Sequence, residues 1–180
     1  MTAETPAAKR EIEAGSRFGF GANWSDFLSV VDEQRVDASV ASLTALLPAS
    51  RIEGHTFLDV GCGSGLSSLA AQRLGAARVC SFDFDDQSVA STRELKRRLA
   101  PDSADWTVMQ GSILDDECVT QLGAWDVVYS WGVLHHTGRM WYALANASKL
   151  VRPGGTLFIA IYNDQGAGSR FWARVKRIYN

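Results

Sequence analysis

Cysteine and proline are scarce in this chain of 180 residues, which contains three cysteines and four prolines. Cys62, Cys80 and Cys118 are odd in number and form no C-x-x-C pair, so the sequence indicates neither a disulfide framework nor a zinc site. Such cysteine usage is typical of a reducing cytoplasm, where we expect the protein to reside. The acids and histidines also lack the spacing of a dedicated metal site, so we expect no metal.

Long hydrophobic runs and an excess of positive charge are missing as well. The first 15 residues are charged and contain no apolar core for export, and no apolar run approaches the roughly 20 residues that a membrane-spanning helix needs. The net charge of -2 provides no global basic field for gripping nucleic acid, although it is compatible with a local basic patch. We therefore expect a soluble protein whose partner is not nucleic acid.

A hydrophobic content of 46% suffices for one domain with a real core. Residues 1–17 are predicted to form a flexible arm, and residues 18–180 a single domain. Strand-like and helix-like segments alternate along it, which predicts an α/β fold: a doubly wound, Rossmann-like, mostly parallel sheet. The predicted strands are residues 56–60, 78–84, 106–110, 125–131 and 156–162, and the predicted helices are residues 30–47, 66–74, 86–100, 115–122 and 140–151.

The last 15 residues, GAGSRFWARVKRIYN, place Phe171, Val175 and Ile178 on one helical face, with basic residues elsewhere around the helix. One interpretation is a helix that covers the core and keeps its charges in water. The alternative is contact with an anionic partner or, weakly, with a membrane surface, which a basic amphipathic helix permits.

The stretch FLDVGCGSGLSS joins a predicted strand to a predicted helix through Gly61, Gly63 and Gly65. Glycines allow a sharp turn and the close approach of a ligand at the carboxyl end of the strand. A dinucleotide fingerprint would read G-x-G-x-x-G, whereas position 66 here is Leu. Asp59, just ahead of the glycines, would repel a pyrophosphate and attract a cation.

A second acid, Asp83, ends the next predicted strand, 18 residues after Gly65. An acid at this position can bind both hydroxyls of a ribose. Together, Asp59 and Asp83 suit a nucleoside that carries an ammonium group and no phosphate. The competing interpretation is that both acids cap helix N-termini.

Five segments carry a resemblance to a known family: LDVGCGSG, FDFDD, QGSILD, WDVVYSWGVLHHT and LVRPGGTLFIAIYN. In order and spacing they resemble the class I S-adenosylmethionine-dependent methyltransferases, over residues 57–163. The segment NWSDFLSVVDEQRVDAS is more loosely similar to the entry helix of ubiquinone-biosynthesis O-methyltransferases. The resemblance implies the cofactor S-adenosyl-L-methionine.

By this resemblance, the glycine turn and Asp59 bind the methionine end of the cofactor, and Asp83 binds the ribose. Ser112 and Ile113 lie where the family contacts adenine. Many members have an acid at the position of Ser112, so Asp115 is an alternative partner for adenine. Ser130 and Trp131 would lie beside the transferring methyl, although Trp131 could equally be core. The implied cofactor-binding residues are Arg35, Asp59, Gly61, Cys62, Gly63, Gly65, Asp83, Phe84, Gly111, Ser112, Ile113, Ser130 and Trp131.

A sulfonium methyl is already activated, so the protein mainly aligns the reactants and excludes water. For a hydroxyl acceptor a general base helps, and His135 and His136 follow the fourth predicted strand. We favour His136; the alternative is that these histidines only bond neighbouring backbone. Cys62 is interpreted as a small buried filler and not as a nucleophile.

The predicted function is methyl transfer to a small-molecule acceptor, such as the O-methylation of a hydroxylated or quinone-type metabolite. The alternative is a catalytically silent S-adenosylmethionine-binding module that acts through a partner. A nicotinamide dehydrogenase is disfavoured by Asp59 and by the glycine spacing. The family fold has seven strands and five are predicted here, so we expect either a C-terminally truncated piece or an edge closed by a partner.

Overall fold

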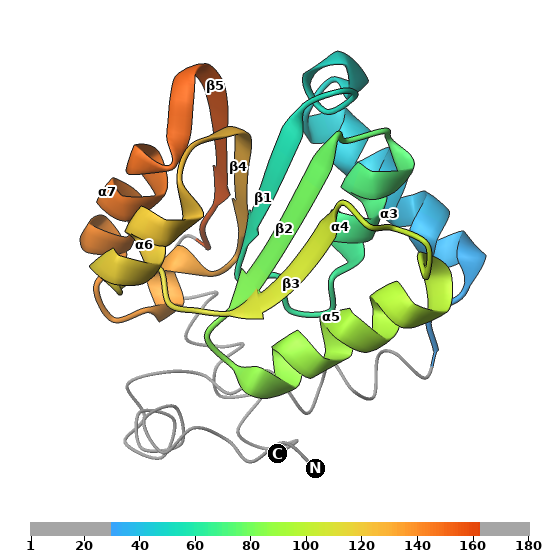
Figure 1. The fold of residues 1–180 in the computed structure, drawn as a ribbon, viewed down its shortest axis with the longest axis horizontal. Coiled ribbons are helices and arrows are strands. Elements are labelled where there is room, and N and C mark those ends of the chain that lie inside the picture. Colours follow the sequence, from blue (N-terminus) through green and yellow to red (C-terminus); the bar gives the residue numbers. More distant parts are fainter. Residues whose placement is uncertain (1–29, 163–180) are drawn as a thin grey trace, which may run out of the picture.

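The computed structural model describes residues 30–162 (Figure 1). The predicted arm at residues 1–17 and the predicted C-terminal helix lie outside this range. Helices and strands alternate through it. In chain order the elements are α3 (Glu33–Leu46), η1 (Ala49–Arg51), β1 (Thr56–Val60), α4 (Leu66–Arg73), β2 (Arg78–Asp83), α5 (Asp86–Leu99), β3 (Trp106–Gln110), α6 (Asp116–Leu122), β4 (Trp125–Trp131), η2 (Leu134–His136), α7 (Met140–Lys149) and β5 (Val151–Ala160).

The five strands form one sheet in the order β3-β2-β1-β4-β5, and every neighbouring pair is parallel. Side chains alternate between the two faces of each strand. On one face Phe57 and Val79 pack with α3, α4 and α5, and on the other face Leu58 and Val128 pack with α6 and α7. The predicted doubly wound α/β fold is confirmed.

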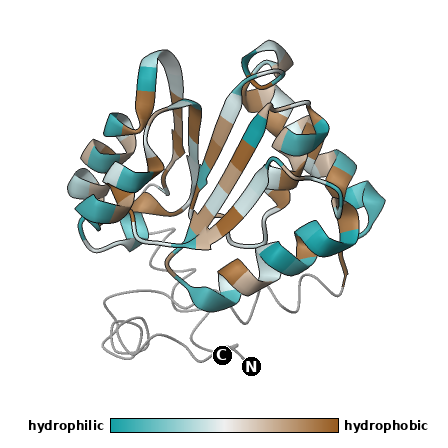
Figure 2. Cartoon of the chain, viewed as in Figure 1, coloured by the Kyte–Doolittle hydropathy of each residue, from teal (hydrophilic) through white to brown (hydrophobic). Residues whose placement is uncertain are grey.

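The hydropathy pattern explains this arrangement, because apolar residues concentrate in the central strands and polar residues on the outer sides of the helices (Figure 2). Three helices start at an aspartate whose side chain accepts a hydrogen bond from a backbone amide of the first turn. These caps are Asp32 for α3, Asp85 for α5 and Asp115 for α6. The cap at Asp32 places the start of α3 three residues later than residue 30, where the helix was predicted to begin.

The start of β5 differs from the prediction. The run Pro153-Gly154-Gly155 was predicted to end a helix ahead of a strand at residues 156–162, whereas β5 already begins at Val151. Val151 pairs with Trp125, and the register then shifts so that Thr156 pairs with Val127. The proline and glycines therefore lie in a bulge within the strand, where a lost ladder bond is tolerated.

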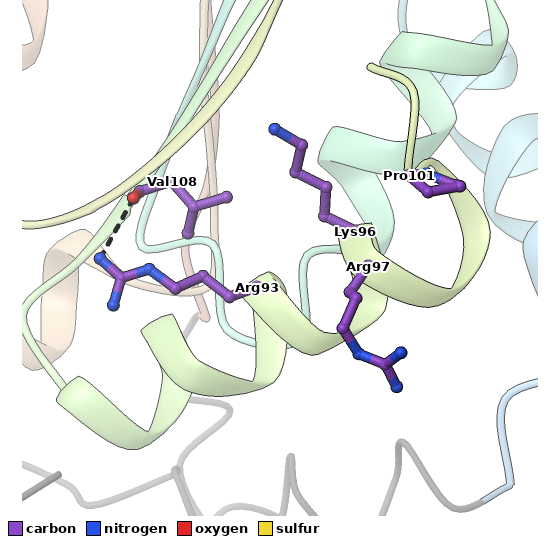
Figure 3. A pocket seen from close by; sticks show the side chains of 5 residues that line it. All are labelled: Arg93, Lys96, Arg97, Pro101 and Val108. Atoms are coloured by element: carbon purple, nitrogen blue, oxygen red, sulfur yellow. Dashed lines mark hydrogen bonds between the residues drawn. The ribbon is translucent and has the colours of Figure 1, made fainter. Parts of the chain in front are cut away.

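A basic surface pocket of about 360 Å³ lies where α5 meets β3, which is an edge strand of the five-stranded sheet (Figure 3). Arg93 donates to the Val108 carbonyl at 3.3 Å, and Lys96 donates to the Trp106 carbonyl. Arg97 forms an ion pair with Glu94 at 2.7 Å. These cations therefore have structural partners, two of them on the edge strand.

Between residues 30 and 162, none of the helices combines the length and the apolar character that crossing a lipid bilayer requires.

Candidate cofactor site

The turn between β1 and α4 depends on its glycines for both conformation and space. Gly61, Gly63 and Gly65 have φ angles of 76°, 54° and 82°, in the left-handed region that other residues rarely adopt. A Cβ atom at Gly61 would lie 2.5 Å from the Val133 side chain, and one at Gly65 would lie 2.7 Å from the Thr92 side chain. The turn is thus packed between the loop after β4 and helix α5.

Asp59 lies on β1 directly before this turn and is 2% exposed. Its Oδ2 atom accepts a hydrogen bond of 2.6 Å from the Ser68 hydroxyl on α4. Burial raises the pKa of the Asp59 carboxyl to about 7, against the opposing effect of the Ser68 hydrogen bond. The carboxyl is therefore poised between its neutral and ionised forms near neutral pH.

Asp83 is half-buried at the end of β2 and is tied to the glycine turn. Its Oδ2 atom accepts from the Gly63 amide at 3.0 Å, and its Oδ1 atom accepts from the Asp85 amide at 3.0 Å. Burial raises the pKa of the Asp83 carboxyl to about 6, although these two amide bonds oppose the shift. The structure thus brings together the two acids and the glycines that the sequence singled out.

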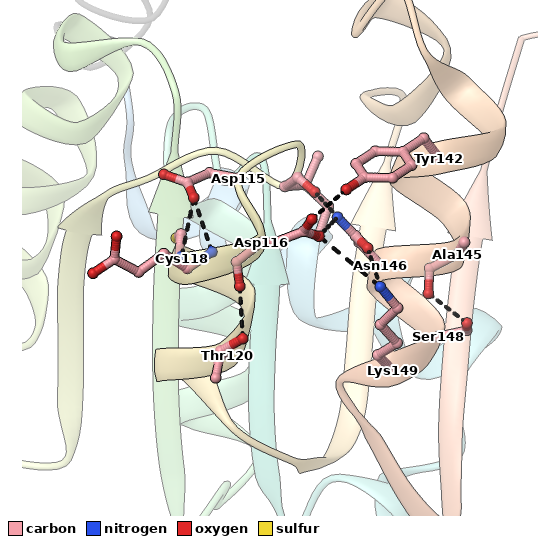
Figure 4. Close-up of polar contacts among 11 residues, drawn as sticks. Asp115, Asp116, Cys118, Thr120, Tyr142, Ala145, Asn146, Ser148 and Lys149 are labelled. Carbon is pink, nitrogen blue, oxygen red and sulfur yellow. Dashed lines mark hydrogen bonds and ion pairs between the residues drawn. The ribbon is translucent and has the colours of Figure 1, made fainter.

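The capping interpretation of these acids does not hold, because the N-cap of α4 is Gly65 and the N-cap of α5 is Asp85. Asp115, the alternative partner for adenine, is itself a helix cap: its Oδ1 atom accepts from the Glu117 and Cys118 amides at 2.9 and 3.4 Å (Figure 4). The exposed Asp115 carboxylate thus already binds the first-turn amides of α6.

The segment after β3 starts beside Asp83, because the Gly111 amide donates to the Asp83 carbonyl at 2.9 Å. The Ser112 hydroxyl accepts from the Leu114 amide at 3.2 Å, and the buried Ile113 carbonyl accepts from the Asn146 side chain of α7 at 2.9 Å. This segment, where the resemblance implies adenine contacts, is therefore held in place from both ends.

The carboxyl end of β4 lies next to the glycine turn. The buried Ser130 hydroxyl donates to the Val60 carbonyl at 3.0 Å. Trp131 is 46% exposed and stacks on Phe158 with ring centroids 6.1 Å apart. The interpretation of Trp131 as a core residue is therefore wrong, and its ring is accessible at the edge of the site.

His135 and His136 lie on η2, in the loop that Val133 packs against Gly61. Their ring centroids are 4.0 Å apart, and the ring of Tyr162 stands edge-on to His135 at 4.9 Å. Both ring nitrogens of His135 are buried and have no hydrogen-bond partner within residues 30–162. Desolvation lowers the pKa of both histidines, so both imidazoles are neutral near pH 7.

Arg35 is not brought to the turn by any hydrogen bond or ion pair among the described residues. Its guanidinium donates to Asp32 Oδ2 at 2.8 Å on the exposed first turn of α3. Ser39, one helical turn further on, donates to the Leu66 carbonyl at 3.2 Å, so this side of α3 adjoins the start of α4. The cofactor contact of Arg35 stays a prediction.

Cys62 and Phe84, two further residues implied to bind the cofactor, both make contacts near the turn. Cys62 is 7% exposed, its sulfur lies 3.3 Å from the Thr92 hydroxyl, and desolvation raises the pKa of its thiol well above the usual value. The interpretation as a buried filler is confirmed. The Phe84 carbonyl accepts from the Gln110 side chain at 3.1 Å, which joins the segments that follow β2 and end β3.

Sequence reasoning missed Ser68, Ser81 and Thr92, which are buried polar residues around the turn. Thr92 donates to the Gly63 carbonyl at 3.0 Å, and Ser81 donates to the Ser68 hydroxyl at 2.6 Å. Serine and threonine within helices and strands carry no motif of their own, so no signal in the sequence marked them.

The donor and acceptor groups of this site fit S-adenosylmethionine. The charged groups that act on the pKa values of Asp59 and Asp83 are other aspartates, and no cation among the described residues neutralises them. Within residues 30–162 no hydrogen bond reaches the carbonyl of Gly61, which follows Asp59 by two residues. These acceptors suit an ammonium group and ribose hydroxyls, and no three or more His, Cys, Asp or Glu side chains in that range are placed to hold a metal ion.

Comparison with known proteins identifies the class. Residues 58–157 match the family described as "Methyltransferase domain". The ubiquinone biosynthesis O-methyltransferase of Caulobacter vibrioides is 32% identical over 117 residues, which are 62% of this chain and 42% of that protein. The ribosomal protein L11 methyltransferase of Thermotoga maritima is 39% identical over 74 residues, which are 36% of this chain and 28% of that protein. The chain thus spans less than half the length of these relatives.

Solved structures agree on the fold. Magnesium protoporphyrin IX methyltransferase from Synechocystis PCC 6803 superposes in its form with bound S-adenosylmethionine at a TM-score of 0.52, with 26% identity over 66% of this chain and 53% of that chain. Its form with bound S-adenosylhomocysteine gives a TM-score of 0.60, with 22% identity over 81% of this chain and 62% of that chain. The fold is that of the class I methyltransferases. The chain belongs to the methyltransferase domain family, and the cofactor of this family is S-adenosylmethionine.

Proposed function

We propose that this chain transfers the methyl group of S-adenosylmethionine to a hydroxyl oxygen of a small hydroxylated or quinone-type acceptor. The observation that carries the proposal is the neutral His135 imidazole in the loop packed on the glycine turn, whose ring nitrogens are buried and have no hydrogen-bond partner within residues 30–162. A hydroxyl acceptor loses a proton as it attacks, and a positioned neutral imidazole can take it.

The roles of the binding residues follow from their chemistry. Asp59 and the Gly61 carbonyl accept hydrogen bonds from the ammonium group, and Asp83 accepts from the ribose hydroxyls. The amides of Gly61 and Cys62 already donate to the Phe82 carbonyl, and the Cys62 carbonyl accepts from the Gly65 amide, so among these groups the Gly61 carbonyl oxygen is the one offered to the ligand. The cofactor supplies the activated methyl group; the protein fixes its orientation and excludes water.

The acceptor class has separate support. Relatives of this chain include methyltransferases named for ubiquinone biosynthesis and for ribosomal protein L11. The match to the ubiquinone-type enzyme covers 62% of this chain, whereas the L11-type matches from Thermotoga maritima and Xanthomonas campestris cover 36% and 54%. The wider match and the histidine pair favour a hydroxylated small molecule over a protein amine.

The test is transfer of label from methyl-labelled S-adenosylmethionine. The chain is incubated with small catechols and hydroquinones and, separately, with the protein fraction of a cell extract. We expect the small molecules to become labelled and the protein fraction to stay unlabelled. A reaction without the protein serves as the control for uncatalysed methylation. Label in protein alone would contradict the small-molecule acceptor, and no transfer despite cofactor binding would favour a catalytically silent module.

A further inference from the structure

Four buried side chains form a continuous hydrogen-bond chain beneath the glycine turn. Trp106 Nε1 donates to the Ser81 hydroxyl at 2.8 Å, Ser81 donates to the Ser68 hydroxyl at 2.6 Å, and Ser68 donates to Asp59 Oδ2 at 2.6 Å. The exposed fractions of the four residues are 1%, 0%, 0% and 2% in that order. All four side chains are therefore shielded from bulk solvent.

The indole of Trp106 determines the donor-to-acceptor direction of this series of hydrogen bonds. An indole N–H can donate and cannot accept, so it occupies a lone pair of Ser81. Each serine has one hydroxyl hydrogen, and both hydrogens point onward to Ser68 and to Asp59. All three bonds are therefore polarised toward the carboxylate, an arrangement that favours its ionised form.

This series of hydrogen bonds connects the edge strand β3 with the central strand β1. Asp59 and Ser81 are register partners on β1 and β2, and neighbouring residues in a ladder point to the same face. Ser68 reaches them from α4, and Trp106 reaches Ser81 from β3. A residue at the far strand of the described sheet is thus linked to the carboxylate at the cofactor turn.

The surroundings of Asp59 give these bonds their importance. The titratable groups that interact with it are Asp83 at the end of β2, Cys62 in the turn, Cys80 on β2 and Tyr129 on β4. None of them is a cation, and Asp83 disfavours a second negative charge. Among the described residues, hydrogen bonds from Ser68 are what lowers the pKa of Asp59 against desolvation.

We propose that Trp106, Ser81 and Ser68 are positioning residues for the cofactor: they hold Asp59 ionised and aimed at the ammonium group. The inference rests on the proposed function, in which Asp59 binds that group. Trp106 touches neither cofactor nor acceptor and acts through the two serines.

The test compares Trp106→Phe with Trp125→Phe. Trp125 is also buried, and its Nε1 atom donates to the Leu122 carbonyl at 2.9 Å on the other face of the sheet. Its replacement therefore removes a similar hydrogen bond that is not part of the series leading to Asp59. S-adenosylhomocysteine affinity would be measured by calorimetry from pH 5.5 to 8.5. Ser81→Ala is a second variant that breaks the middle link, and circular dichroism would verify folding.

The sign of the effect follows from the pKa of Asp59. The neutral carboxyl cannot pair with an ammonium group, so wild-type affinity should fall as the pH drops below about 7. Loss of the indole N–H raises the pKa of Asp59 further and moves this fall to higher pH. Trp106→Phe should bind about threefold to tenfold more weakly than wild type at pH 7 and about equally at pH 8.5, whereas Trp125→Phe should follow wild type throughout.

Asp83 titrates nearby, but the hydrogen bonds that lower its pKa come from backbone amides and are untouched by these variants. In an Asp59→Asn background, the Trp106→Phe replacement should no longer change the pH profile. Equal weakening at every pH would show a merely structural role and overturn the inference alone. A wild-type chain that binds no S-adenosylhomocysteine at any pH would overturn the proposed function instead.

Discussion

Replacing Asp83 with asparagine is expected to weaken S-adenosylhomocysteine binding about tenfold to a hundredfold. The Asp83 carboxylate is proposed to accept the ribose hydroxyls, and a hydrogen bond to a charged group contributes about 1.5–3 kcal/mol. Asparagine keeps one acceptor oxygen for the Gly63 amide, which donates to Asp83 at 3.0 Å, and loses the acceptor for the Asp85 amide, so circular dichroism would verify that the variant folds. Isothermal titration calorimetry at pH 8 measures the change with Asp83 ionised, since its pKa is about 6.

Asp85→Asn is the matched control. Asp85 lies two residues away, caps α5, and accepts from the Gln87 amide at 3.1 Å. Asparagine caps helices as well as aspartate does, so the affinity of this variant should stay within about twofold of wild type. An unchanged affinity for Asp83→Asn would remove Asp83 from the ribose role.

The largest effect on turnover is expected from His135→Gln, which should lower kcat about a hundredfold to ten-thousandfold with little change in cofactor affinity. Glutamine preserves polarity but cannot take the acceptor's proton. Since desolvation lowers the pKa of His135 below its usual 6.5, the wild-type rate should be level near pH 7 and fall as the pH drops through that lowered value. Steady-state kinetics with the best labelled acceptor measures both effects.

Two further histidine variants test whether the effect is specific to His135. His55→Gln replaces an exposed histidine whose Nδ1 atom lies 2.8 Å from the Glu53 carbonyl, and it should leave the rate unchanged. His136→Gln distinguishes the two rings of the pair, because the sequence favoured His136 whereas the structure favours His135, both of whose ring nitrogens are buried with no hydrogen-bond partner among residues 30–162. A His135→Gln chain with the wild-type rate would return His135 to a structural role.

The strands were predictable where the local pattern and the tertiary pairing agree. The observed ranges of β1, β3 and β4 match the predicted ranges at both ends. The start of β5 was not predictable, because Pro153 and the two glycines after it are strong local stop signals. Pairing of Val151 with Trp125 overrides these signals, and such pairing depends on contacts distant in sequence.

The candidate site was predictable to the extent that it depends on backbone conformation and charge. The glycines marked a sharp turn, and Asp59 and Asp83 marked acceptors at two neighbouring strand ends, which the structure places together. Ser68 and Ser81 were not predictable as site residues, since they meet Asp59 only through strand register and helix packing. Burial, which sets the pKa of Asp59 and of Asp83, also follows from the assembled fold.

The central claim is that the glycine turn, with Asp59 and Asp83, binds the methionine end and the ribose of S-adenosylmethionine. Calorimetric titration of the wild-type chain with S-adenosylhomocysteine and, separately, with NAD tests it most directly. The expected result is one site for S-adenosylhomocysteine and no binding of NAD, because Asp59 repels a pyrophosphate at short range. Binding of NAD without binding of S-adenosylhomocysteine would contradict it.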